Sequence, residues 1–89
     1  NMEVYNGRQK LKLPASQNAA DYRPGDFVAW NLRPGGSLPH IGIVSDRWNH
    51  AGTRPLILHN IGAGVQEEDI LFAYPITGRY RFYSSTPEK

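Results

Sequence analysis

The sequence predicts a small antiparallel β structure, a meander of about five short strands with at most a helical stub at its front. Short runs rich in β-branched and aromatic residues recur along the chain, and turn-forming residues separate them. Nine Gly and seven Pro among 89 residues supply those turns. A composition of 39% hydrophobic and 20% charged residues is typical of a globular chain. No repeat or boundary is visible, so we expect one domain over residues 1–83 and a tail over 84–89.

The N-terminal segment has the weakest secondary-structure pattern. The apolar residues of 2–5, followed by Asn6-Gly7, predict the last turn of a helix, because Gly commonly ends helices. Leucines alternate with lysines over residues 8–13, which favours a short edge strand. Residues 14–21 are rich in Ala, Ser, Gln and Asn and predict a loop.

The centre of the chain gives the clearest strand signals. Pro24 and Gly25 suit the two central positions of a type II turn, because Pro fixes φ and Gly accepts positive φ. The apolar run 27–30 then predicts a strand that is buried on both faces. The next expected elements are a turn at residues 33–37 and strands at residues 40–44 and 56–60.

The last third predicts weaker elements. Gly62 and Gly64 make residues 61–65 too glycine-rich for a strand interior, so we expect a bend that leaves space for a close approach. The remaining expected elements are an acidic turn at residues 66–69 and short strands at residues 70–73 and 80–83.

Two histidines at strand ends are the main functional signal. Side chains alternate between the faces of a strand, so His40 and Gly42 share one face while His59 and Asn60 lie on opposite faces of theirs. If the two strands are antiparallel neighbours, His40 should lie within about 4 Å of a polar atom of His59 or Asn60. A catalytic base needs such a partner to orient its ring. Gly42 either leaves room for a helix beside the imidazole or relieves crowding between strands.

Other sites are less well supported. Metal binding by His40, His50 and His59 is disfavoured, because they are nine and ten residues apart and His50 lies in a polar loop. The basic residues are scattered and no long apolar stretch exists, so neither nucleic-acid binding nor a membrane span is expected. Glu67, Glu68 and Asp69 are interpreted as a solvated turn. Trp48 stands out among the aromatic residues because it lies in an expected loop.

Several motifs carry a family resemblance. The segments 24–30, 40–44 and 58–60 resemble the strand signatures of NlpC-type cell-wall peptidases. More closely, segments 40–46, 59–64, 66–69 and 75–78 resemble the C-terminal half of a bacterial exported family, the domain of unknown function numbered 1287. The resemblance implies an α+β, papain-like core, of which this chain holds mainly the antiparallel sheet. It also implies a periplasmic or secreted location and peptidoglycan or its stem peptide as the partner.

The same resemblance assigns roles to residues. His40 would be the general base and His59 the orienting residue, with Asn60 the second choice, and Asp26 would be structural. The nucleophile would be a cysteine, but this chain has none, so we expect it upstream of Asn1 and expect these residues alone to be inactive. Such a mechanism needs no metal or organic cofactor.

A different class of function stays open. The chain could be a non-catalytic module that binds cell-wall peptide or glycan. Trp48 and the bend with Gly62 and Gly64 would then contact the ligand.

Overall fold

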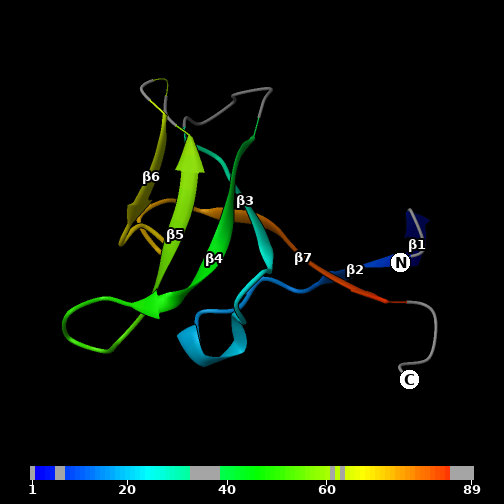
Figure 1. Ribbon diagram of the computed structural model, residues 1–89, viewed down its shortest axis with the longest axis horizontal. Helices are drawn as coiled ribbons and strands as arrows, with labels where there is room; N and C mark the ends of the chain where they lie inside the picture. The colour runs from blue at the N-terminus through cyan, green and yellow to red at the C-terminus, as the bar shows by residue number, and fades with distance from the viewer. Residues whose placement is uncertain (1, 6–7, 33–38, 61, 63, 85–89) are drawn as a thin grey trace.

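The computed structural model describes residues 2–5, 8–32, 39–60, 62 and 64–84. They form one antiparallel sheet in the order β1-β2-β7-β3-β4-β5-β6 (Figure 1). The strands are β1 (Met2–Tyr5), β2 (Arg8–Leu13), β3 (Phe27–Trp30), β4 (His40–Trp48), β5 (Pro55–Asn60), β6 (Val65–Glu68) and β7 (Ile76–Ser84), and a short 3-10 turn, η1, spans Ala19–Asp21.

The expectation of an α+β, papain-like core is wrong for this chain. The described residues contain no α-helix, and η1 has only three residues. The helix expected over residues 2–5 is instead β1, in which Tyr5 pairs with Arg8 and Met2 with Leu11. The sequence signal was ambiguous, because an Asn-Gly pair favours a two-residue hairpin connection as well as a helix end.

Three more elements differ from expectation. The acidic turn at residues 66–69 is largely β6, which pairs along β5, and residues 70–73 form a turn and no strand. The strand that begins at His40 continues to Trp48, beyond the expected end at residue 44. The turn expected at 33–37 and most of the tail at 84–89 lie outside the described residues.

The core lies between the sheet and the connection that joins β6 to β7. Since β6 is an edge strand and β7 pairs with β3, this connection must cross one face of the sheet (Figure 1). It buries Leu71 completely, and the indole Nε1 of Trp30 donates a hydrogen bond to the Leu71 carbonyl at 2.8 Å. The buried members of the core are Tyr22, Val28, Trp30, Val44, Ile57 and Leu71.

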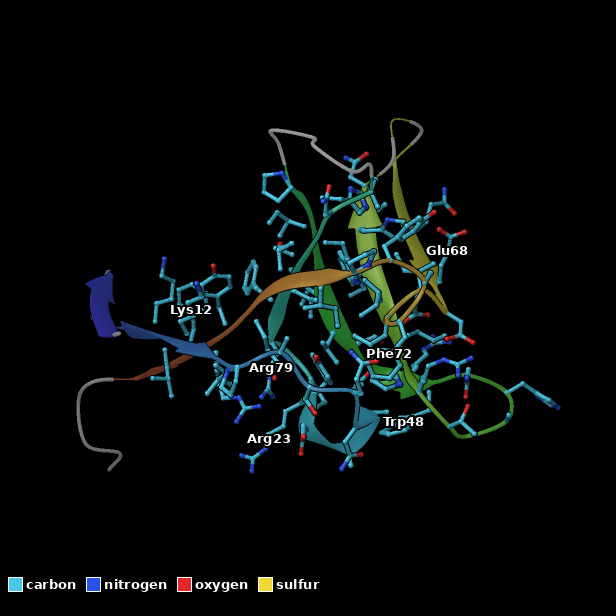
Figure 2. The ribbon with its side chains drawn as sticks, turned by 180° about the vertical axis from the view of Figure 1, so that it is seen from behind. Lys12, Arg23, Trp48, Glu68, Phe72 and Arg79 are labelled. Atoms are coloured by element: carbon cyan, nitrogen blue, oxygen red, sulfur yellow. The ribbon has the colours of Figure 1, made fainter. Side chains whose placement is uncertain are left out.

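The segment between β2 and β3 is anchored to the sheet by an arginine. Arg79 of β7, labelled in Figure 2, is buried, and its guanidinium donates to the carbonyls of Pro14 and Asp21 at 3.1 and 2.6 Å. These bonds satisfy carbonyls that lie outside the strands of the sheet. Arg79 therefore stabilises the loop that carries η1 and Tyr22.

The two faces of β4 and β5 are unlike. Val44 and Ile57 face the core, whereas Ile41, Ile43 and Leu58 are 46%, 36% and 36% exposed.

No helix among the described residues is long and apolar enough to cross a membrane.

The space beside Gly42 is already filled. A Cβ added at Gly42 would lie 2.5 Å from Cγ2 of Ile57 and 2.9 Å from the Trp30 ring. Of the two interpretations of Gly42, relief of crowding between strands is the one that these contacts support.

Candidate functional site

The two histidines expected to meet do meet. His40 is the first residue of β4, and His59 is opposite Gly42 in the β4–β5 pairing. Because residues two apart share a face, both imidazoles point to the core side of the sheet. Nε2 of His40 lies 2.8 Å from Nδ1 of His59, and the rings are nearly perpendicular at 86° with centroids 5.0 Å apart. The two residues therefore share one hydrogen bond.

A carboxylate extends this pair to a third residue. Oε1 of Glu68, the last residue of β6, lies 2.6 Å from Nε2 of His59. Both ring nitrogens of His59 are thus used, which suits a side chain that is only 4% exposed. We call the sequence of hydrogen bonds from His40 through His59 to Glu68 the histidine chain.

Trp30 supports the histidine chain from the core. Its ring lies 5.9 Å from the His40 ring, and the bond from its Nε1 to Leu71 fixes its position. Burial against this surface lowers the pKa of His40 below the usual 6.5, and the neighbouring His59 lowers it further. A lowered pKa keeps His40 neutral near neutral pH, the form that can accept a proton.

Glu68 is the residue that the sequence did not single out. It belongs to the acidic run interpreted as a solvated turn, but each carboxylate of that run has its own partner. Glu67 accepts a 2.5 Å hydrogen bond from Ser45, and Asp69 pairs with Arg54 at 2.9 Å. Recognising residues 65–68 as the second strand of a hairpin would have placed Glu68 on the face of His59.

Asn60 and Trp48 do not take part in the histidine chain. Asn60 points to the opposite face of β5, and its side chain accepts from the backbone of Gly62 at 3.0 Å. Trp48 is 43% exposed at the far end of β4, eight residues or about 25 Å of strand from His40. In Figure 2 it lies well below Glu68.

The glycine bend lies next to the histidine chain. Gly62 and Gly64 have φ of 90° and 111°, so glycine is required there by conformation, and a Cβ at either would meet open space. Because the bend directly follows β5, it lies at the His59 end of that strand and away from Trp48. The structure does not unite Trp48 and the two glycines in one surface.

The other polar candidates have structural partners. Asp26 is 2% exposed, and both of its oxygens accept from Arg81 at 2.8 Å.

Within the described part of the chain, no group of three His, Asp or Glu side chains is arranged to hold a metal ion.

Comparison with known families gives a match over nearly the whole chain. Residues 1–82 match the family described as Domain of unknown function (DUF1287). The chain belongs to this family. A relative, "Uncharacterized protein YijF" of Escherichia coli (strain K12), is 48% identical to the chain over 83 residues. That alignment covers 93% of the chain but 39% of YijF, and no solved structure matches the chain.

Proposed function

We propose that this DUF1287 domain supplies the general base of a cell-envelope cysteine hydrolase, with His40 as the base and His59 as the residue that orients it. The observation that carries the proposal is the 2.8 Å hydrogen bond between Nε2 of His40 and Nδ1 of His59. It occupies one nitrogen of His40 and leaves Nδ1 to exchange a proton with a reacting group. Since His59 is itself held by Glu68, the imidazole of His40 is oriented through its Nε2, on the side away from the reacting group, as a nucleophile–base pair requires.

The nucleophile in this proposal is a cysteine on a segment outside these 89 residues, upstream of Asn1. Nδ1 of His40 takes the thiol proton, and the thiolate attacks the carbonyl carbon of an amide. His40 returns the proton to the nitrogen of the departing amine, which leaves a thioester. His40 then takes a proton from water as the water attacks the thioester, and it protonates the released thiolate. These steps use no metal or organic cofactor.

The substrate class rests on the motif resemblance to NlpC-type peptidases. We propose an amide bond in the stem peptides of peptidoglycan, and hence a periplasmic or secreted location. This part of the proposal is separate from the geometry of His40, because a general base of this kind suits any amide.

The experiment uses the natural full-length protein. Iodoacetamide labelling near pH 6.5 with a peptide map should identify one rapidly alkylated cysteine upstream of the DUF1287 domain. His40→Ala should lower the turnover of purified peptidoglycan by about 10²- to 10⁴-fold, the range for loss of a general base. The matched control is His50→Ala, because His50 is exposed and lies in the loop between β4 and β5. Full turnover with His40 replaced, or no reactive thiol, would contradict the proposal.

The binding-module alternative has weaker support. Trp48 is exposed, as a ligand-stacking residue should be, but it lies at the opposite end of the sheet from Gly62 and Gly64. In that alternative Trp48→Ala would weaken peptidoglycan binding and His40→Ala would not. Measuring binding for these two variants beside turnover separates the two functions.

A further inference from the structure

We infer that Glu68 is a positioning residue that sets the direction of the hydrogen bonds in the histidine chain. The inference rests on the proposed function of His40 as a base. A neutral imidazole has one N–H and one lone pair. To accept a proton at Nδ1, His40 must therefore carry its own proton on Nε2 and donate it to His59.

The contact between the two histidines does not fix this direction by itself. A distance of 2.8 Å suits a proton on Nε2 of His40 and equally a proton on Nδ1 of His59. In the second arrangement the proton of His40 would be on Nδ1. His40 could then not act as a base there.

Glu68 decides between the two arrangements. A carboxylate only accepts hydrogen bonds, so the 2.6 Å contact requires the proton of His59 to be on Nε2. In neutral His59 the other nitrogen, Nδ1, is then an acceptor. His40 must donate to it from Nε2, which leaves the lone pair of His40 on Nδ1, where the proposed mechanism needs it.

The sheet places Glu68 for this task. Glu68 is opposite Ile57 in the β5–β6 pairing, and Ile57 shares its face with His59, two residues further on. The His59 side chain is 4% exposed, whereas the Glu68 side chain is 45% exposed. The direction of bonds around a buried imidazole is therefore set from the accessible edge of the sheet.

The neighbouring carboxylates have other partners. Glu67 accepts from Ser45 and lies 3.8 Å from Arg47. Asp69 accepts from Arg54 through two hydrogen bonds of 2.9 Å. Glu67 is thus a matched control, since it has the same charge at the adjacent position but contacts a different set of residues.

The direct test is the protonation pattern of the two imidazoles, read by two-bond ¹H–¹⁵N NMR correlation at about pH 8, where histidine is mostly neutral. Protonated and unprotonated ring nitrogens have well-separated ¹⁵N shifts. We expect both His40 and His59 to carry the proton on Nε2. A proton on Nδ1 of either residue in the unmodified chain would overturn the inference without the need for any variant.

Variants give a second test. In Glu68→Gln the side-chain amide can donate as well as accept, so both directions are allowed and the spectrum should show a mixture of the two patterns. Glu67→Gln should keep the pattern of the unmodified chain. An unchanged pattern in Glu68→Gln would overturn the inference.

Turnover by the natural full-length protein separates this inference from the proposed function. Glu68→Gln should lower kcat/KM about tenfold, as for other residues that orient a functional histidine, and Glu67→Gln should not. If the expected NMR pattern is found in a protein without turnover, the proposed function fails and the role of Glu68 stands. If His40→Ala abolishes turnover while Glu68→Gln changes neither turnover nor the NMR pattern, the role of Glu68 fails and the proposed function stands.

Discussion

Two buried polar groups of this sheet, Asp26 and His59, are satisfied in opposite ways. Asp26 accepts two hydrogen bonds from Arg81 and one from the backbone of Arg23, and these three residues form a closed cluster. His59 instead links Glu68 at the accessible edge of the sheet to His40 at the start of β4. A closed cluster stabilises a fold, whereas a chain with an accessible end can move a proton. This difference is the reason that the proposed function is assigned to the histidine chain and not to the Asp26 cluster.

The closed cluster should have the larger effect on stability. Asp26→Ala leaves the guanidinium of Arg81 without its carboxylate, and breaking a buried ion pair in this way costs several kcal/mol. Because the Arg81 side chain is 25% exposed, we expect a loss at the lower end of that range, about 3 kcal/mol. Urea unfolding followed by circular dichroism measures it.

The control for this prediction is the exposed pair of Arg54 and Asp69. The two side chains are 40% and 34% exposed, so Asp69→Ala should change the urea midpoint far less than Asp26→Ala. Equal losses for the two variants would show that the Asp26 cluster is no anchor, and the contrast with the histidine chain would lose its basis.

The part of the site that depends on the alternation of side chains along single strands could be predicted from the sequence. The strands at residues 27–30 and 56–60 and the start of a strand at His40 are present, and the contact of His40 with His59 follows from pairing two of them. The roles of the two histidines stay predictions. Glu68 was missed because β6 has the sequence Val-Gln-Glu-Glu, which lacks the apolar alternation of a half-buried strand.

The rest of the fold depends on distant pairings. β1 and β6 lie at the two edges of the sheet, where backbone pairing with a single neighbour replaces a hydrophobic pattern. The crossing from β6 to β7 is fixed by Leu71 and by its bond with Trp30, which is 41 residues away in sequence. No window of neighbouring residues carries that information.

A loss of stability of intermediate size is expected for a substitution at Gly42, where the core meets the histidine chain. In Gly42→Ala the new methyl group would meet Ile57 and Trp30 at distances that no real contact shows, so one of them must move. Overpacking of this kind costs about 1–3 kcal/mol, measurable by urea unfolding. Because Trp30 lies against His40, the NMR signals of the His40 ring should shift as well. Ile41→Ala, on the exposed face one residue away, should leave those ring signals in place.

The smallest expected effect is the contribution of His40 to the pH dependence of the free energy of unfolding. Burial first, and His59 second, lowers the pKa of His40 below 6.5, so between the two values the unfolded chain binds more protons than the folded one. The free energy of unfolding should therefore fall as the pH drops through 6.5 and level off above it. Arg54 lowers the pKa of Asp69 below 3.8, so that group loses its stabilising effect only at more acidic pH. Urea midpoints at about pH 7.5 and pH 5.5 should thus differ less in His40→Gln than in the unmodified chain. Equal pH dependence with and without His40 would mean that its proton equilibrium is not coupled to folding.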